Sequence, residues 1–260
     1  MPLQRVYKTE AIILKGLKLN EADKILTLYT PNQGKIKAIA KGVSRPKSKL
    51  RGHVESLTYS TLMLAHGTNL DIITQGQTIN SFLAFRDNLW RTSCALYAAE
   101  LVDRFTPEHM ENRSVFELLR DALHALCLVN DAEIVLRHFE LHLLEHSGYR
   151  PQLNNCIRCN TSLNPTTNFF SIAGGGVLCP DCQYKESLVQ PISLNALKVL
   201  RFLQNNNVSS VIHLITTPRL QLELEQLTRN YIRYLIEKET GSSKWLDQIR
   251  KLSQTEHKKT

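Results

Sequence analysis

The sequence predicts an α+β protein in which a small N-terminal β-barrel of the OB-fold type precedes a mainly helical domain with an inserted four-cysteine module. Three observations predict this arrangement. The first 80 residues carry short period-two segments, apolar residues follow a period of 3.6 from about residue 87, and two Cys-x-x-Cys pairs interrupt the helical part. We expect the barrel at residues 1–80, the helical domain at 81–250 with the cysteine module at about 150–190, and a disordered tail at 251–260.

Five short segments of strand character, separated by turn residues, build the predicted barrel. They cover residues 11–14, 25–29, 35–40, 57–65 and 70–74. The breaks between them fall at residues 20–23 and 31–34, in a long basic loop after residue 40, and at residues 66–69. Five strands within about 75 residues favour a small closed barrel, and the OB-fold is a barrel of this kind that binds nucleic acids.

The net charge of +8 is concentrated in the first third of the chain. Residues 1–86 carry 13 Lys and Arg against 5 Asp and Glu, whereas residues 87–260 carry 19 of each. No acid lies between Asp23 and Glu55, and a field of one sign favours a polyanion such as nucleic acid. We predict that nucleic acid binds Lys35, Lys37, Lys41, Arg45, Lys47, Lys49 and Arg51. A solvated basic loop without a ligand is the alternative.

The third barrel segment alternates between apolar and basic residues. We expect the inward set to be Ile36, Ala38 and Ala40 and the outward set to be Lys35, Lys37 and Lys41, while Ile39 breaks the alternation. Aromatic residues are sparse in the barrel segments, which hold Tyr7, Tyr29 and Tyr59 only. Phosphate contact is therefore a stronger expectation than base stacking.

Apolar periodicity places five helices in the rest of the chain. The first carries apolar residues from 94 to 105 and stops at Thr106-Pro107. A second begins at a capping box on Ser114 and ends at about 128, and a third runs from Asp131 to Gly148. After the cysteine module, Ser193 caps a fourth helix, and a long fifth helix covers about 219–239.

Four cysteines form two pairs, Cys156/Cys159 and Cys179/Cys182, with nineteen residues between the pairs. This spacing is typical of a tetrahedral zinc site, because each pair can present two sulfurs from one tight turn. Four protein ligands leave no open position, so we expect one structural zinc per chain and no catalytic metal. Two redox or disulfide pairs are the alternative.

One catalytic motif competes with this interpretation. Residues 142–146 (HLLEH) match the H-x-x-E-H pattern of zinc proteases, in which two histidines bind zinc and the glutamate serves as base, and Glu223 or Glu225 could supply a third ligand. We prefer ordinary helical histidines, because the motif runs directly into the helix end at Gly148. The sequence contains no phosphate-binding loop, nucleophile elbow or dinucleotide fingerprint, and we expect no enzymatic activity. With no secretory signal and no membrane span, we expect a cytoplasmic protein without a membrane partner.

Several runs of the sequence together resemble the family of the bacterial DNA repair protein RecO. In the barrel region these runs are residues 11–14 (AIIL), 20–26 (NEADKIL), 34–36 (GKI), 41–45 (KGVSR) and 47–52 (KSKLRG). Further on they are residues 137–141 (RHFEL) and 148–159 (GYRPQLNNCIRC), with a looser match at 231–232 and 243–246. Asn160 stands where that family usually has glycine, and Asn can adopt the same left-handed turn.

The resemblance implies a recombination mediator that is not an enzyme. Proteins of this family bind single- and double-stranded DNA, anneal complementary strands, work with the partner RecR, contact the tail of the single-stranded-DNA-binding protein, and help RecA load on coated strands. It also implies a bacterial, nucleoid-associated protein. An RNA-binding factor that combines an OB-fold with a zinc ribbon remains open, since the same charges and sulfurs would serve RNA.

Overall fold

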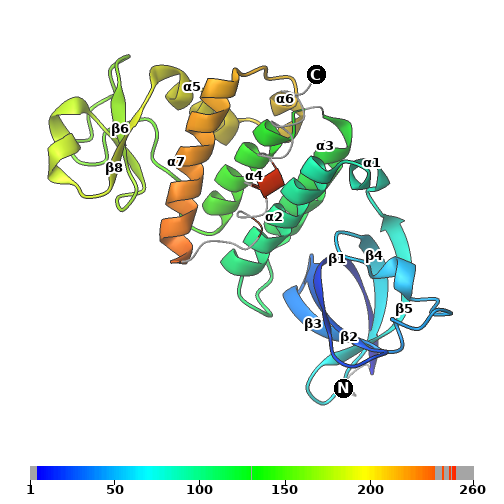
Figure 1. Cartoon of the computed structure of the whole chain (residues 1–260). Coiled ribbons are helices and arrows are strands. Elements are labelled where there is room, and N and C mark those ends of the chain that lie inside the picture. The colour runs from blue at the N-terminus through cyan, green and yellow to red at the C-terminus, as the bar shows by residue number, and fades with distance from the viewer. Residues whose placement is uncertain (1–4, 130, 238–241, 243–245, 247, 250–260) are drawn as a thin grey trace. The chain divides into compact units, whose positions relative to one another are not determined.

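The structure is a computed structural model that describes residues 5–129, 131–237, 242, 246, 248 and 249. The chain divides into two compact units, Met1–Cys127 and Leu128–Thr260, each of which is described by itself below (Figure 1). The predicted disordered tail at 251–260 lies outside the described residues. The predicted domain boundaries at 1–80 and 81–250 stay a prediction. Within the described residues, no helix combines the length and the apolar character needed to cross a bilayer.

The first unit begins with a closed five-stranded barrel of the predicted OB type. Its strands are β1 Val6–Lys18, β2 Lys24–Thr30, β3 Gly34–Ala40, β4 Tyr59–Ala65 and β5 Asp71–Asn80. The order around the barrel is β1-β2-β3-β5-β4, with β4 pairing back onto β1 and only β3 and β5 running parallel. All five predicted strands are present and are mostly longer than expected. Inward residues of the five strands form one apolar core, which includes Leu26, Leu28, Ile36 and Ala38.

Three helices follow the barrel in the same unit: α1 Leu83–Arg86, α2 Leu89–Phe105 and α3 Arg113–Leu128. The predicted helix ending at residue 105 is confirmed as α2, and the Asn88 side chain caps its start by accepting from the Arg91 amide. The capping box at Ser114 is wrong. The Val115 amide donates instead to the side chain of Asn112, at 3.2 Å, so the capping residue lies two residues earlier and the helix begins at Arg113.

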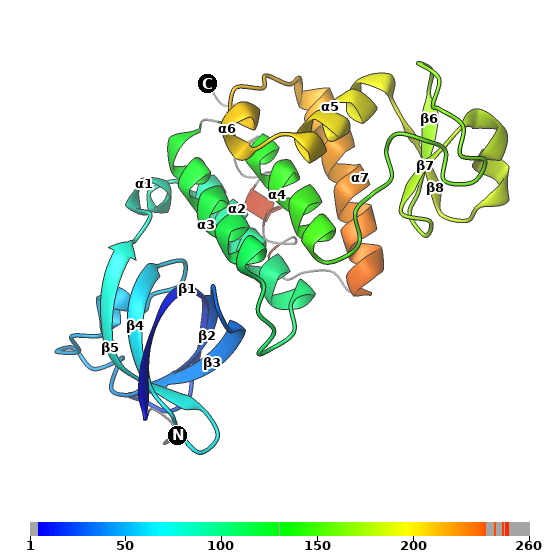
Figure 2. The same cartoon turned by 180° about the vertical axis from the view of Figure 1, so that it is seen from behind.

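The second unit joins a helical bundle to a small cysteine-bearing sheet. Its helices are α4 Ala132–His146, α5 Leu194–Asn205, α6 Val208–Val211 and α7 Pro218–Ile236, and its sheet has the order β7-β6-β8. The strands are β6 Asn168–Ser171, β7 Gly176–Leu178 and β8 Val189–Ile192. Helix α4 packs against α5, α6 and α7, as the view from behind in Figure 2 shows. The predicted helix start at Asp131 and the predicted cap Ser193 are confirmed, whereas α7 ends at Ile236 because Glu237 turns left-handed at φ 53°.

Candidate nucleic-acid interface and metal centre

The basic segment between β3 and β4 is a packed loop. Its apolar residues Val43 and Val54 are buried in the barrel core, and Leu50 packs against the same core. The short 3-10 turn Arg51–His53 ends the segment, and the His53 carbonyl accepts the Ser60 hydroxyl of β4 at 2.7 Å. Alternation of apolar anchors with basic residues therefore fixes the backbone and leaves the charges outside.

Hydrogen bonds tie the start of this loop to the turn between β1 and β2. The Gly42 amide donates to the Asp23 carboxylate at 2.6 Å, and the Ser44 amide donates to the Ala22 carbonyl at 2.9 Å. Gly42 adopts φ 64°, a left-handed conformation that favours glycine. The bond from Gly42, then that from Asn20, and the charges of Arg45 and Lys41 hold the pKa of Asp23 below its usual range. The loop and the β1–β2 turn consequently form one surface.

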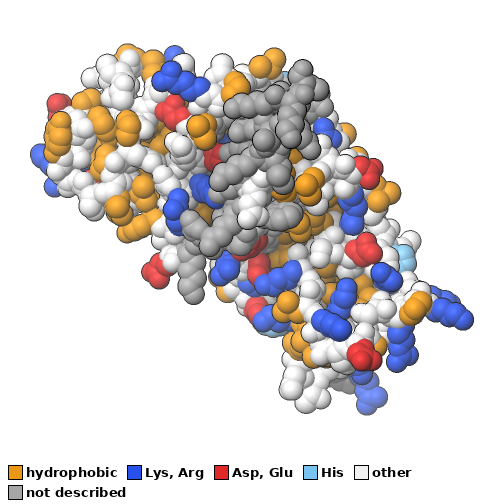
Figure 3. Space-filling model, in the orientation of Figure 1, with side chains coloured by type: hydrophobic (Ala, Val, Ile, Leu, Met, Phe, Trp, Pro, Cys, Tyr) orange, Lys and Arg blue, Asp and Glu red, His pale blue; other side chains and the backbone are white. Residues whose placement is uncertain are grey.

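Five of the seven predicted nucleic-acid residues lie exposed on this loop: Lys41, Arg45, Lys47, Lys49 and Arg51. We call this set the basic loop. Among the described residues, none of the five makes an ion pair with an acid. On the face shown in Figure 3, Lys and Arg side chains gather over the barrel. Their charge is thus available to a polyanion in solution.

The other two predicted residues are engaged by acids of their own unit. Lys35 points out of the barrel, as expected, but its side chain is only 10% exposed because α2 lies over it. Its ammonium group contacts the Asp103 carboxylate at 3.2 Å and donates to the Asp103 carbonyl. Lys37 remains partly exposed but pairs with Glu108 at 2.5 Å. Both acids follow or end α2, about 70 residues away in the chain, a distance that strand periodicity cannot bridge.

Asp103 is the centre of this network. Burial alone would raise its pKa, but the hydrogen bond from Lys15 and the charge of Lys35 outweigh burial and hold the pKa below its usual range. The segment after α2 is also fixed through the backbone, since the His109 amide donates to the Lys35 carbonyl at 2.9 Å. Gly34 permits this approach, because a Cβ there would lie 1.9 Å from the Met110 carbonyl oxygen. The network therefore fixes the α2–α3 connection to β3.

The four predicted metal ligands lie together at one end of the small sheet. The sulfurs of Cys156, Cys159, Cys179 and Cys182 are all within 4.8 Å of one another. The Cys159 and Cys179 sulfurs are 3.7 Å apart, close to the roughly 3.8 Å expected between ligands of a tetrahedral zinc with bonds of about 2.3 Å. A disulfide bond requires a sulfur–sulfur distance of about 2.05 Å, and all four cysteines are free thiols. The arrangement fits a closed four-sulfur metal site.

The backbone around the first pair has the tight turn that such a site needs. Asn160 adopts φ 56°, as expected for an Asn in place of glycine, and its amide donates to the Cys156 carbonyl at 2.9 Å. Hydrogen bonds from the Thr161 hydroxyl and amide lower the pKa of Cys159 to about 6, so one thiolate forms readily. Burial, and then the neighbouring thiols, raise the pKa of Cys182 to about 12. A divalent cation would stabilise the four thiolates together.

The H-x-x-E-H histidines do not form a metal site in the part of the chain that the structure describes, where the four cysteines are the only such group. A ring nitrogen of His142 lies 3.1 Å from the Leu203 carbonyl, and Glu145 pairs with Arg150. Glu223 accepts from the Ser193 amide and hydroxyl at the start of α5, and so serves as a capping partner. Glu225, the other residue that could have supplied a third ligand in the disfavoured protease interpretation, pairs with Arg229.

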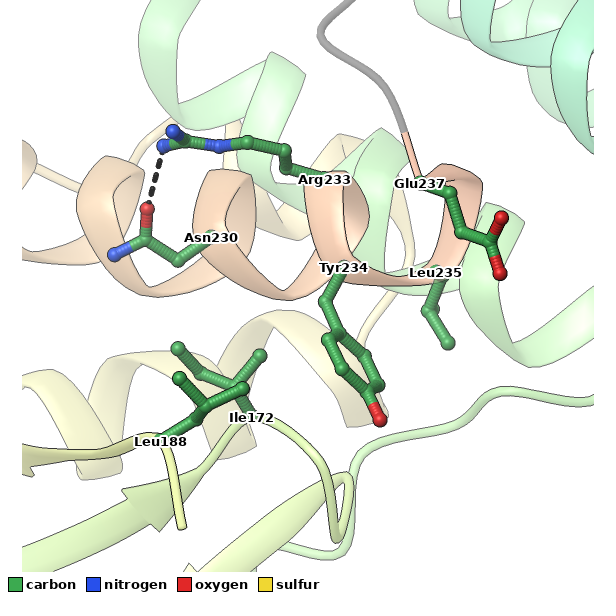
Figure 4. A pocket seen from close by; sticks show the side chains of 7 residues that line it. All are labelled: Ile172, Leu188, Asn230, Arg233, Tyr234, Leu235 and Glu237. Atoms are coloured by element: carbon green, nitrogen blue, oxygen red, sulfur yellow. Dashed lines mark hydrogen bonds between the residues drawn. The ribbon is translucent and has the colours of Figure 1, made fainter.

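Sequence patterns did not locate a groove between α7 and the small sheet. It has a volume of about 700 Å³ and is lined by Ile172, Leu188, Asn230, Arg233, Tyr234, Leu235 and Glu237. Figure 4 shows Ile172 and Leu188 on the sheet side facing Tyr234, with Arg233 joined to Asn230 along α7. Of two other arginines of this unit, Arg137 is buried against Glu140 and Arg229 pairs with Glu225. An apolar groove with a guanidinium at its side suits an acidic, apolar peptide.

Comparisons with known proteins agree over nearly the whole chain. Residues 3–82 match the family described as Recombination protein O N terminal, and residues 86–244 match Recombination protein O C terminal. The DNA repair protein RecO of Dehalococcoides mccartyi strain 195 is 43% identical over 243 residues, covering 94% of this chain and 96% of the relative. RecO of Roseiflexus sp. strain RS-1 is 42% identical over an alignment that covers 96% of this chain and 88% of the relative. RecO of Desulforamulus reducens is 36% identical over an alignment that covers 95% of this chain and 96% of the relative.

Proposed function

The chain belongs to the RecO family of DNA repair proteins, and from this premise we propose that it is a recombination mediator that binds single- and double-stranded DNA and anneals complementary strands. It would act without catalysing a covalent reaction, together with RecR, and would help RecA load on single strands that carry the single-stranded-DNA-binding protein. We place this action in the bacterial cytoplasm, at the nucleoid.

The observation that carries the proposal is the basic loop. Five exposed cations on a packed backbone can replace the counterions of a phosphate backbone, and release of those counterions drives binding. Neutralising two strands on one surface lowers their mutual repulsion, which allows complementary bases to meet. Phosphate contacts carry no sequence information, so annealing of this kind serves any complementary pair.

We assign the four cysteines to one structural zinc. When bound, zinc would supply four metal–thiolate bonds that hold the two Cys-x-x-Cys turns together. Cys156 and Cys182 are buried beside Leu178 in the same small cluster, so the ligands also form the core of this sheet. The role of the metal is therefore to stabilise the surface that faces α7.

We assign the groove beside Arg233 to the tail of the single-stranded-DNA-binding protein. Leu188 and Tyr234 offer apolar surface that is 58% and 45% exposed, and Arg233 offers a cation to an acidic peptide. Docking of this tail would bring coated strands to the protein.

An annealing assay tests the proposal. We expect the chain to anneal bare complementary DNA without nucleotide, and to anneal strands coated with the cognate single-stranded-DNA-binding protein only when that protein retains its acidic tail. Equal annealing with the intact and the tail-deleted coating protein would refute the docking assignment. No annealing of bare DNA would refute the mediator, and preferred annealing of RNA strands of the same sequence would favour the RNA-binding factor.

A further inference from the structure

The barrel carries an apolar row on its outer wall. Strand register pairs Leu17 with Ile25, Ile25 with Ile39, and Ile39 with Ile72, so the four side chains lie side by side across β1, β2, β3 and β5. They alternate with the inward residues Leu26, Ala38 and Ile73, and therefore point away from the core. Ile39, which breaks the alternation of apolar and basic residues in its strand, is one member of this row.

The row lies next to two rows that the helices of the same unit cover. In one covered row, Tyr29 and Lys35 are buried; in the next, Lys15 and Lys37 pair with Asp103 and Glu108. The apolar row is open by comparison. Leu17 is 61% exposed, and Leu19, two residues further along the β1–β2 hairpin, is 48% exposed. Ile25, Ile39 and Ile72 are partly exposed.

Positive charge lies at one end of the open row. Lys18 and Lys24 are paired across the hairpin and exposed, and exposed Lys41 follows β3 directly. Asp23 is occupied by the Gly42 amide and by Asn20, which leaves Glu21 as the exposed acid of this hairpin. Lysines are depleted in protein–protein interfaces, so an apolar strip with three of them at one end fits a protein partner poorly.

We propose that this row, Leu17, Ile25, Ile39 and Ile72, together with the adjacent Leu19, receives the unstacked bases of a single nucleic-acid strand whose phosphates lie on Lys18, Lys24 and Lys41. A single strand exposes apolar base faces beside its phosphates, whereas a duplex hides those faces in its stack. The basic loop attracts both forms, and the apolar row favours the single strand. This inference rests on the proposed function and adds the residues that distinguish single-stranded from double-stranded DNA.

The tyrosines of the barrel are not available for this contact. Tyr29 is buried, the Tyr7 hydroxyl donates to Asp71, and Tyr59 donates to Glu10 and packs edge-on against Phe116. Aliphatic side chains are consequently the apolar surface that this wall offers to bases.

The double variant Leu17→Ser/Leu19→Ser in the full chain tests the inference. Both residues are strongly exposed, so we expect the fold to persist, as checked by circular dichroism. The Kd is measured for a labelled mixed-sequence DNA strand and for its duplex, each over a series of salt concentrations. We expect about tenfold weaker binding of the single strand, duplex binding changed less than about twofold, and an unchanged salt slope, because apolar contacts release no counterions.

A matched control is Ile79→Ser, a side chain of the same barrel that is 48% exposed and lies outside the row. We expect it to change neither affinity. As an independent readout, Leu17→Trp should strengthen binding of the single strand, and its fluorescence should be quenched by the single strand but not by the duplex.

The outcomes separate this inference from the proposed function. If the unaltered chain binds no DNA, the proposed function fails. If it binds DNA and the double variant binds both forms unchanged, the row does not contact bases and the inference fails while the proposed function stands. Equal losses for strand and duplex, a smaller salt slope, or quenching of Leu17→Trp by the duplex would also overturn the inference.

Discussion

Neutralising the basic loop tests how the protein holds DNA. The variant replaces Lys41, Arg45, Lys47, Lys49 and Arg51 with Gln, and all five side chains are exposed, so the fold should persist. Each phosphate contact with a single strand contributes roughly 0.7 to the slope of log affinity against log salt, so losing five contacts should lower the slope by about 3.5. Over a fourfold rise in salt, a slope of that size accounts for about a 100-fold change in affinity.

The matched control is Lys37→Gln. Lys37 already pairs with Glu108, so replacing it should leave the salt slope nearly unchanged even though it lies on the neighbouring strand. The assay is fluorescence anisotropy with a labelled single strand at several salt concentrations, with circular dichroism as the test of folding.

Two results would refute the reasoning. A folded five-residue variant with an unchanged slope would mean that the basic loop is only solvated and that DNA binds elsewhere. A drop in slope for Lys37→Gln as large as that for one loop residue would mean that DNA displaces Glu108, and that the ion pairs on β3 do not remove their lysines from the interface.

Three further predictions concern the metal, the buried lysine and pH. Metal analysis with X-ray absorption should find one zinc per chain surrounded by four sulfurs, and nitrogen ligands would contradict this. The Cys179→Ser variant should lose the metal and loosen the small sheet while its binding of single-stranded DNA persists. Lys35→Ala should destabilise the first unit by about 3 kcal/mol in denaturant unfolding, because it leaves Asp103 poorly compensated; a loss confined to DNA affinity would contradict it. The pKa of Asp103 is depressed, so its stabilisation is present above the usual aspartate pKa and is lost as pH falls through the folded-state pKa. The protection of the amides of residues 106–112 against hydrogen exchange, measured relative to their intrinsic exchange rates at each pH, should therefore fall in acid, and Asp103→Asn should abolish this pH dependence of the protection.

Local sequence determined much of this protein. The five strands, the helix starts at Asp131 and Ser193, and the left-handed turn at Asn160 follow from side-chain alternation, capping and turn chemistry, which act over a few residues. The spacing of the two cysteine pairs likewise predicts a four-sulfur metal site, and the four sulfurs lie together as that spacing predicts.

Tertiary structure alone decided which basic residues remain available. The sequence pattern predicts the same outward direction for Lys35 and Lys41. However, α2 lies over Lys35 and places Asp103 against it, while Lys41 is exposed to solvent. The groove beside Arg233 and the outward row through Ile39 also depend on which element covers which face. Periodicity gives the direction of a side chain relative to its own strand, but the burial and pairing of that side chain depend on residues far away in the chain, and these are fixed only when the elements pack together.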